Sequence, residues 1–383
     1  MTYSSKKMHS DILIVGGGGG GDALASLIAA RTLSIPREEA VFATVIWERT
    51  LFDPQPGPRA PEDFQRLKPV GKHNYLVHAQ SSLPHPALTF TPRLAATYEV
   101  DYHLLDITRG AKKVQHQVQE LQEIYGFEKI IVVDVGGDIL ARGDEPGLKS
   151  PLADGMALAG MQGAEAEIQV AVTGFGLDGE LSQSALKKAR ADLSHAKNSS
   201  VPTHIDNATA SDFVDVFEWF PSESSGLTCV SALGYEGVAE IRDQGLRVTL
   251  SQRSHALDLY DYEAVLHRNR VANAFVETSS IKEGESILDD FGLTSEIEFE
   301  RRKAQRLKKA LEDKPAEENH ESLENDLLAY SKRVSAKGVR YITMRRMAEV
   351  LHLPHSERMD FLSYLEPRYP ERLIPPVWIC PNK

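Results

Sequence analysis

The sequence predicts an α/β fold in which helices cover a mainly parallel sheet. Apolar runs of strand length alternate with helical stretches through the first two-thirds of the 383-residue chain. Most of these runs are apolar at successive positions, as expected of strands that are buried on both faces. The first run leads through six consecutive glycines into an alanine-rich helix. Together, these observations predict a Rossmann-like, doubly wound sheet.

Taken in order, the elements of this sheet follow from the apolar pattern. The expected strands are Ile12–Val15, Val41–Trp47, Tyr102–Ile107, Lys129–Val133 and Ile168–Thr173. The expected helices are Asp22–Ala30, Arg109–Tyr125, Pro151–Met161 and Glu180–Ala196. Residues 50–92 interrupt the alternation with a long segment rich in Pro, Gly and His, which is typical of a lid or a substrate wall. Residues 207–292 are predicted to be mostly helical, with one strand at Leu246–Leu250.

A highly charged segment divides the chain into three parts. Residues 1–296 form the α/β domain with a glycine-rich ligand site, and residues 297–325 form a solvated helix and linker. Residues 326–383 are expected to form a small helical extension with two short helices around a turn. Its Arg340, Arg345 and Arg346 would suit a DNA-reading helix-turn-helix, but the acidic residues beside them favour packing or homo-oligomerisation.

Composition excludes several classes of partner. The net charge of −12 at pH 7 argues against broad binding to nucleic acid or to an anionic membrane. No apolar stretch reaches the length of a membrane span. The two cysteines, Cys229 and Cys380, are far apart, which argues for a reducing compartment and against a zinc cluster. We therefore expect a cytoplasmic protein.

The glycine run from Gly16 to Gly21 is the first candidate ligand site. It joins the first strand to the helix that starts at Asp22, where free backbone N–H groups and the positive helix end favour an anion. The run includes the pattern G-x-G-x-x-G at Gly16, Gly18 and Gly21, with Gly19 between them. No Lys-Ser or Lys-Thr follows, so it is not a Walker loop. The alternative is a tight turn without a ligand.

Two further strands end in glycine-rich turns. Gly136 and Gly137 follow the strand at Lys129–Val133, and Gly174 and Gly176 follow the strand at Ile168–Thr173. The carboxyl ends of parallel strands lie along one edge of a sheet, where ligands bind. The sequence therefore predicts a broad cleft walled by backbone N–H groups.

The same turns carry carboxylates, of which Asp134, Asp138 and Asp178 are the candidate catalytic residues. Several carboxylates beside a phosphate would repel it, so we expect Asp134 and Asp138 to hold magnesium. Alternatively, one of the two caps the next helix and the other pairs with Arg142 or Lys149. Ser150 and Asp154 have simpler roles open to them, as an N-cap and as a complement to the helix dipole.

The end of the second strand supplies a different kind of candidate. Glu48 is placed where an acidic residue binds the adenosine ribose in dinucleotide folds. Arg49 and Arg59 are candidate clamps for a phosphate or carboxylate, although Arg49 could instead pair with a surface acid.

Three segments together resemble a family of bacterial and archaeal proteins known as domain of unknown function eleven fifty-two. They are GGGGGGDALA, DVGGDILARGDEPGLKSPLADGMALA and TGFGLDGEL, and the resemblance covers roughly residues 10–290. It implies a shared α/β fold with a glycine-rich site and implies no activity. Glu48-Arg49 and residues 134–138 are also similar to pieces of the D-glutamate cyclase type of domain, although here no Pro-Gly follows Arg49 directly.

These observations predict an enzyme that acts on a phosphorylated or nucleotide-like small molecule with the help of magnesium. Hydrolysis, group transfer and cyclisation all fit the residues. One alternative is an NAD(P)-dependent oxidoreductase with Glu48 on the ribose. The other is a non-catalytic nucleotide sensor whose C-terminal unit reports the bound state.

Overall fold

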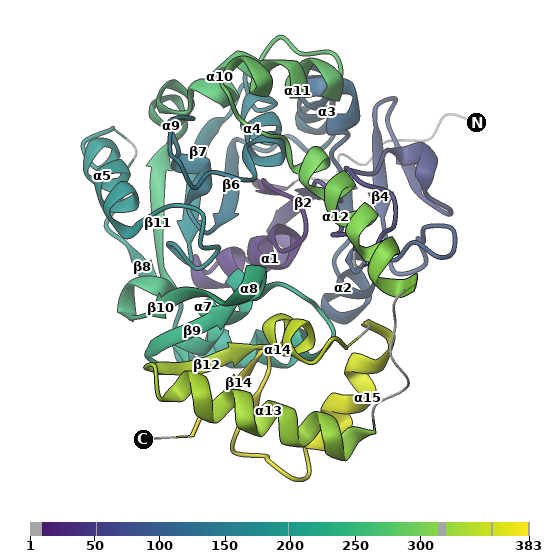
Figure 1. Cartoon of the computed structure of the whole chain (residues 1–383). Coiled ribbons are helices and arrows are strands. Elements are labelled where there is room, and N and C mark those ends of the chain that lie inside the picture. Colours follow the sequence, from purple (N-terminus) through teal and green to yellow (C-terminus); the bar gives the residue numbers. More distant parts are fainter. Residues whose placement is uncertain (1–9, 51, 198, 313–318, 354, 382–383) are drawn as a thin grey trace.

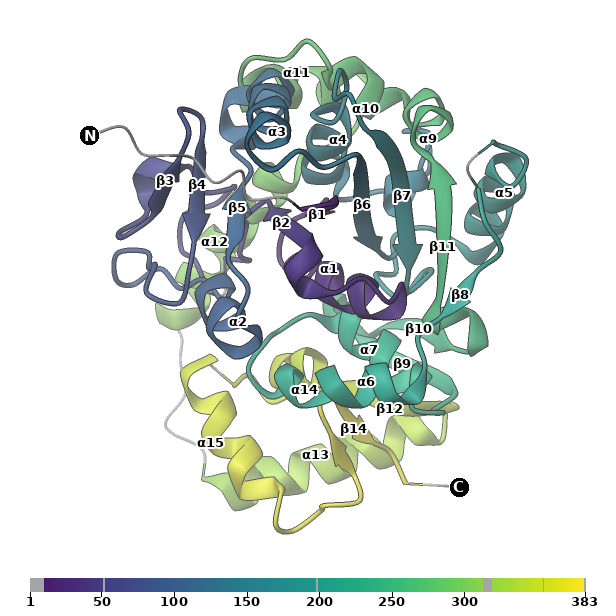
Figure 2. The ribbon, with the colours of Figure 1, turned by 180° about the vertical axis from the view of Figure 1, so that it is seen from behind.

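A computed structural model describes residues 10–381 apart from 51, 198, 313–318 and 354. Its strands form two sheets (Figures 1 and 2), one with nine strands and one with five. No helix within the described residues is long and apolar enough to cross a membrane.

The large sheet has a parallel centre and antiparallel edges. Its parallel strands are β1 (Ile12–Gly16), β2 (Ala40–Thr44), β5 (Tyr102–Leu104), β6 (Lys129–Val135) and β7 (Glu167–Thr173), in the spatial order β5-β2-β1-β6-β7. The antiparallel edge strands are β3 (Lys68–Val70) and β4 (Asn74–Val77) beyond β5, and β11 (Ala256–Asp261) and β8 (Thr203–His204) beyond β7. The predicted α/β class with a mainly parallel sheet is confirmed.

The order of the strands locates the edge at which a ligand is expected. From β1 the chain builds β2 and β5 on one side, and then crosses to build β6 and β7 on the other. The carboxyl ends of β1 and β6 therefore lie side by side in the parallel part of the sheet. The glycine run follows β1, and Asp134 lies near the end of β6.

Helices bury both faces of the large sheet. They are α1 Asp22–Thr32, α2 Thr91–Tyr98, α3 Gly110–Tyr125, α4 Pro151–Ala159, α5 Gln183–Leu193, α6 Asn207–Phe213, α7 Glu223–Ala232, α9 Tyr262–Arg268, α10 Arg270–Phe275 and α11 Ile281–Asp290. Leu13 and Val15 of β1 belong to a core with α3, α4, α9 and α10, whereas Ile12 and Ile14 belong to a second core with α1, α6 and α7. This two-sided burial explains why the central strands are apolar at successive positions.

The C-terminal unit contains strands as well as helices, which corrects the expectation of a helical extension. Its helices are α13 (His320–Ser335), α14 (Met344–Val350) and α15 (His355–Leu365), and its strands are β12 (Val339–Thr343), β13 (Leu373–Ile374) and β14 (Val377–Ile379). β12 pairs with β9 (Gly237–Ile241), which continues through the one-turn helix α8 (Arg242–Gly245) into β10 (Leu246–Leu250). The five-stranded sheet, β10-β9-β12-β14-β13, thus joins residues from both halves of the chain.

Three other segments differ from the sequence prediction. Residues 207–292, expected to hold one strand, contain the three strands β9, β10 and β11. Residues 50–92, expected to be an irregular loop, include the β3–β4 hairpin that extends the large sheet. The charged segment begins as α12 (Glu296–Glu312), which crosses the front of the molecule in Figure 1. Glu296, Ile297 and Glu300 are buried, so the first turns of α12 pack on the α/β body and are not solvated as expected. Further along α12, Arg301 and Arg302 are exposed, as expected of a solvated helix.

Candidate functional site

A cleft of about 900 Å³, including the open space at its mouth, lies outside the carboxyl ends of β1 and β6. Its lining comes from the turns and helix starts at one edge of the large sheet, from α8 and α14, and from α12. The charged and hydroxyl side chains that line it are Asp22, Glu48, Arg49, Asp134, Asp138, Ser150, Asp154, Asp178, Glu180, Ser222, Glu223, Ser224, Arg242, Glu296 and Arg345. The cleft has an acidic wall at the strand ends and a wall that carries arginines.

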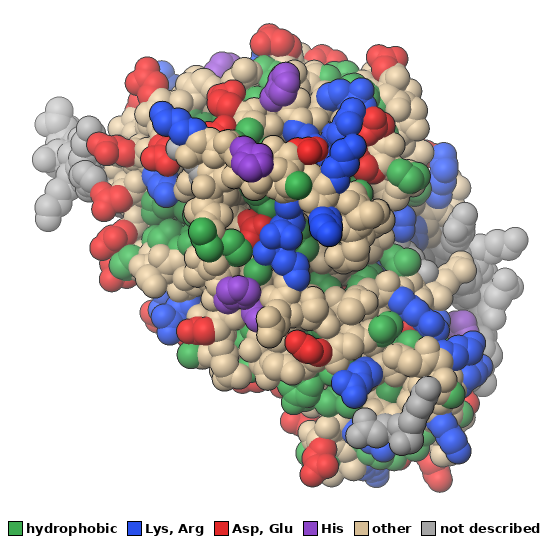
Figure 3. Space-filling model, turned by 90° about the vertical axis from the view of Figure 1, so that its left-hand side faces the viewer, with side chains coloured by type: hydrophobic (Ala, Val, Ile, Leu, Met, Phe, Trp, Pro, Cys, Tyr) green, Lys and Arg blue, Asp and Glu red, His purple; other side chains and the backbone are tan. Residues whose placement is uncertain are grey.

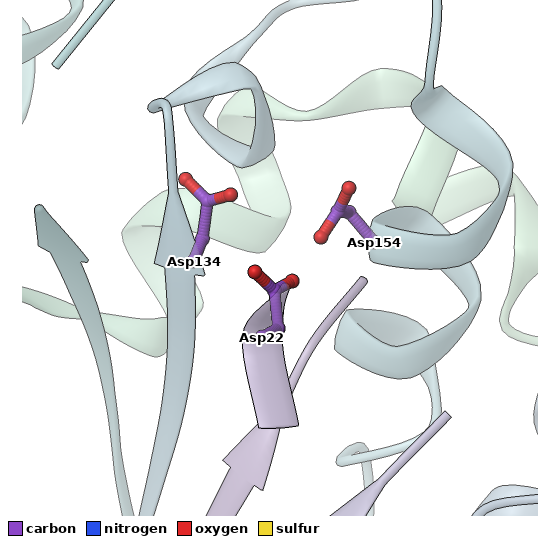
Figure 4. A group of neighbouring side chains, drawn as sticks. All are labelled: Asp22, Asp134 and Asp154. Carbon is purple, nitrogen blue, oxygen red and sulfur yellow. The ribbon is translucent and has the colours of Figure 1, made fainter. Parts of the chain in front are cut away.

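Three aspartates form the centre of the acidic wall. Asp22 is in the first turn of α1, Asp134 is on β6, and Asp154 is in the first turn of α4. One carboxylate oxygen of each lies within 4.8 Å of the others. Figure 4 shows the three carboxylates pointing toward one another. We call these three residues the aspartate triad.

The glycine run allows the triad to close. A Cβ atom on Gly18 would lie 2.7 Å from Oδ1 of Asp154 and 2.7 Å from Oδ2 of Asp22. The backbone N–H of Gly18 also donates a hydrogen bond of 2.6 Å to Asp22 Oδ2. Of the six glycines, only Gly20 has a positive φ, at +70°. Close approach to carboxylates, more than backbone conformation, therefore explains why Gly18 is a glycine.

The triad is buried, and its charge is poorly compensated. Burial raises the pKa of Asp22 to about 7. Burial and the neighbouring carboxylates raise the pKa values of Asp134 and Asp154 well above the usual range. Asp134 accepts a hydrogen bond from Gly137 N, but Oδ1 of Asp154 has no hydrogen-bond partner among the described residues. Three converging carboxylates with an unpartnered oxygen fit a hard cation that prefers oxygen ligands.

A second acidic group surrounds Ser150. The Ser150 hydroxyl lies within hydrogen-bond distance of Asp138 Oδ2, at 3.0 Å, and of Glu180 Oε1, at 2.5 Å. Glu180 also accepts hydrogen bonds from the backbone N–H groups of Lys149 and Ser150, at 2.7 and 3.0 Å. Burial raises the pKa of Asp178 to about 7, and its Oδ2 is buried with no hydrogen-bond partner among the described residues. Ser150 precedes α4 as predicted, but its side chain bonds to these acids and makes no cap.

Glu296 of α12 caps α4 instead. Its carboxylate accepts hydrogen bonds from Leu152 N, at 2.9 Å, and Ala153 N, at 3.0 Å. One turn later, Glu300 accepts hydrogen bonds from the Trp47 indole, at 2.8 Å, and from Gly57 N, at 3.0 Å. The start of α12 thus contacts both the segment that follows β2, at Trp47 and Gly57, and α4, the helix that carries Asp154.

Three arginines line the other wall. Both Arg242 Nη1 and Arg345 Nη1 face Glu223 Oε2, at distances of 2.9 and 3.6 Å. Burial lowers the pKa of Arg345 to about 10. Arg49 is less buried, and its nearest acidic partner is Glu300 at 4.0 Å. Glu223 thus faces two guanidinium groups of this wall, and guanidinium groups are well suited to bind an anion.

The structure brings most of the predicted residues to the cleft. Gly18, Gly19, Gly21, Asp22, Glu48, Arg49, Asp134, Asp138 and Asp178 line it. Gly16, Arg59, Gly136, Gly137, Gly174 and Gly176 do not. Gly136 packs so closely against Asp178 that a Cβ atom on Gly136 would collide with the Asp178 carboxylate. Arg59 is buried in an ion pair with Asp53, so it is not exposed to the cleft as an anion clamp.

Glu48 lines the cleft and also accepts hydrogen bonds from a neighbouring segment of the chain. Its Oε1 accepts hydrogen bonds from Thr89 Oγ1, at 3.1 Å, and Phe90 N, at 3.0 Å. Burial raises its pKa to about 7. These contacts tie Glu48 to the end of residues 50–92, a local role that the sequence does not indicate.

Sequence reasoning missed the arginines at 242 and 345 and the glutamates at 223 and 296 as parts of the site. Arg345 is separated from the glycine run by more than 300 residues, and no local motif connects them. Glu296 lies at the start of a charged run that has the composition of a solvated helix. Glu180 follows a predicted strand, and Asp154 lies in the first turn of a predicted helix. These positions are the sequence signal that could have placed both acids in the same cleft as Asp134.

Comparison with known proteins identifies the family and gives no activity. The model of a family described as "Protein of unknown function (DUF1152)" matches residues 13–304, about three-quarters of the chain. Arg345 and the rest of the C-terminal unit lie outside this match. No curated protein and no solved structure matches the chain. The chain therefore belongs to the DUF1152 family, as the glycine-rich motifs predicted.

Proposed function

We propose that this protein is an enzyme that acts on a phosphorylated or nucleotide-like small molecule, with a divalent cation at the aspartate triad. The observation that carries the proposal is the triad itself, with an unpartnered Asp154 oxygen, opposite a wall that carries arginines. A hard cation would offset the repulsion among the three carboxylates. We infer magnesium as the ion, because carboxylate sites that also meet phosphates commonly hold it.

The two walls suit the two ends of a phosphate-bearing molecule. A cation at the triad could coordinate phosphate oxygens and polarise a phosphoryl group or activate water. Arg49, Arg242 and Arg345 would bind remaining negative charge, since guanidinium groups pair well with phosphate. The strand order also supports a doubly wound, Rossmann-like sheet, in which ligands bind in the crevice where the triad lies.

Asp138 and Asp178 are the candidates for proton transfer. Both line the cleft beside the triad, and burial raises the pKa of Asp178 to about 7. A carboxyl group that titrates near neutral pH can accept a proton from a hydroxyl group or water and return it later. The arrangement is compatible with hydrolysis, group transfer or cyclisation of such a substrate.

The surface supports a small-molecule ligand better than a nucleic acid. Acidic and basic side chains are interspersed over the face in Figure 3, where no continuous basic surface is visible. Nucleic-acid binding needs a basic patch or stripe, and the net charge of the chain is −12.

Thermal unfolding in a magnesium or manganese titration tests the proposal. The wild type should gain stability with millimolar metal, because the ions bind only the folded triad. Asp154→Asn should lose most of this gain, and Asp290→Asn, which changes an exposed aspartate at the end of α11, should keep it. An equal gain in Asp154→Asn and wild type, or no gain in either, would refute the metal site.

An NAD(P)-dependent oxidoreductase is the second candidate, supported by the position of Glu48 in the cleft beside the glycine run. One of its oxygens already accepts two hydrogen bonds from the chain, which weakens this candidate. Calorimetry distinguishes the two: NAD or NADP should bind to the wild type and lose about 1.5–3 kcal/mol of affinity in Glu48→Ala. Absence of binding to the wild type removes the candidate.

A further inference from the structure

A smaller pocket opens beside the main cleft, between α7 and the C-terminal unit. It encloses about 230 Å³, including open space. Its walls come from Phe217, residues 220–223, α14, α15 and Pro376. Five of its lining residues, Phe220, Pro221, Ser222, Glu223 and Arg345, also line the main cleft. The two pockets therefore adjoin at Glu223 and Arg345.

Arg358 of α15 lies in the wall of this smaller pocket. The residue is only 3% exposed, and its Nε has no hydrogen-bond partner among the described residues. A buried guanidinium N–H without a partner is costly, since buried polar groups are nearly always hydrogen-bonded. An acceptor brought by a ligand would satisfy it.

The charges around the pocket are also unbalanced. Arg345 and Arg358 line it together with one acid, Glu223, which already faces Arg242 and Arg345. Burial lowers the pKa values of Arg345 and Arg358, yet guanidinium groups remain charged at neutral pH. Among the residues that line the pocket, two guanidinium groups therefore meet one buried carboxylate, and an anionic ligand group would offset the remaining positive charge.

We propose that the smaller pocket is an anion subsite in which Arg358 and Arg345 bind a phosphate group of the small molecule held in the main cleft. The inference rests on the proposed function for the identity of that molecule, which must then carry a phosphate remote from the one at the aspartate triad. Planar guanidinium groups provide several N–H donors for the oxygens of one phosphate.

The subsite assigns a role to the C-terminal unit. Arg345 and Arg358 lie beyond residues 13–304, the part that matches the family model. The α/β body supplies the triad and the glycine run, and the C-terminal unit adds the remote anion site. The unit thus determines which phosphorylated molecule is accepted, in addition to its packing role.

Inorganic phosphate is a direct probe, used in metal-free buffer at constant ionic strength. Calorimetry and thermal unfolding should show binding to the wild type. In Arg358→Met the affinity should fall about tenfold or more, as expected for loss of a charged hydrogen bond. The matched control is Arg340→Met, because Arg340 is an exposed arginine on β12 of the same unit and should leave the affinity unchanged.

Stability without phosphate separates a binding role from a structural one. Since Arg358 Nε is unpartnered, Arg358→Met should be at least as stable as the wild type in phosphate-free buffer. It should also lose the gain in stability that phosphate gives the wild type. A structural role predicts the opposite, a clear loss of stability in the absence of phosphate, and that result would overturn the inference.

The aspartate triad is tested independently in the same experiment. Asp154→Asn should lose the metal-dependent gain and keep phosphate binding in metal-free buffer. If the metal effect is absent while phosphate binding depends on Arg358, the proposed function fails and the anion subsite stands. If the wild type does not bind phosphate, or if Arg358→Met binds it equally well, the subsite is refuted whatever the metal result.

Discussion

At the scale of single residues, the site depends on carboxylates that are held close together against their own repulsion. Gly18 illustrates how the chain permits this, because its missing side chain leaves room for Asp22 and Asp154. The same cleft contains Glu48, a buried acid with a raised pKa. Two predictions concern these residues.

The first prediction is that Gly18→Ala disrupts the aspartate triad. Its φ is not positive, so an alanine meets no backbone strain, but its Cβ would lie 2.7 Å from two carboxylate oxygens. The variant should lack the stabilisation by magnesium that we propose for the wild type, as thermal unfolding would show. Gly20→Ala is the control: its positive φ costs about 1 kcal/mol, yet its nearest neighbour is 3.9 Å from the new Cβ, so the metal effect should persist. Equal metal responses in the two variants would contradict the prediction.

The second prediction concerns pH. Burial raises the pKa of Glu48 from 4.5 to about 7, so the folded state keeps a proton that the unfolded state releases. Glu48 therefore makes the protein progressively less stable as the pH rises from about 4.5 to about 7, by up to about 3 kcal/mol. Urea denaturation across this range should show a smaller loss of stability in Glu48→Gln than in the wild type. Glu298→Gln, which changes a partly exposed glutamate, should behave like the wild type. Parallel curves for all three proteins would refute the assignment.

At the scale of elements, α12 is the connection between the α/β body and the C-terminal unit. Its first turns are buried by specific contacts, with Glu296 on the N-terminus of α4 and Glu300 on Trp47. The helix that carries Asp154 is therefore positioned by a residue far along the chain.

The third prediction is that Glu296→Ala destabilises the protein. It leaves the N–H groups of Leu152 and Ala153 without their acceptor in a buried setting, at a cost of about 1–3 kcal/mol. The variant should also bind metal more weakly, because Asp154 follows the uncapped turn. Urea denaturation measures the first effect and a magnesium titration the second. Glu298→Ala removes a partly exposed glutamate whose ion partners, Arg301 and Arg302, lie on α12 itself, so it should change both properties much less. A similar loss there would contradict a specific role for Glu296.

At the scale of the whole molecule, the sequence was sufficient where local signals decide the structure. The strand at residues 12–15, the glycine run and the helix from Asp22 were predicted because apolar runs and glycine turns are local features. The parallel edge rule then placed Asp134 in the same cleft as the glycine run. The membership of the aspartate triad was only partly predicted. Asp134 meets Asp22 and Asp154, whereas the Ser150 hydroxyl donates to Asp138.

Other features arise from contacts that no local pattern encodes. The predicted helical extension missed β12, because a short strand is specified by its pairing with β9 about 100 residues earlier. Arg345 reaches the cleft through that same pairing, since α14 directly follows β12. Arg59 looked like an anion clamp, but the buried Asp53 takes its charge. Tertiary contacts thus decided which charged residues remain available to a ligand.

The most direct test of the account is to locate manganese in crystals of the wild-type protein by anomalous scattering. Manganese replaces magnesium at carboxylate sites and scatters strongly enough to be placed without ambiguity. The account predicts an anomalous peak among the carboxylates of Asp22, Asp134 and Asp154, within coordination distance of the Asp154 oxygen that lacks a partner. Crystals grown with millimolar manganese that show no peak at the triad would contradict the central claim.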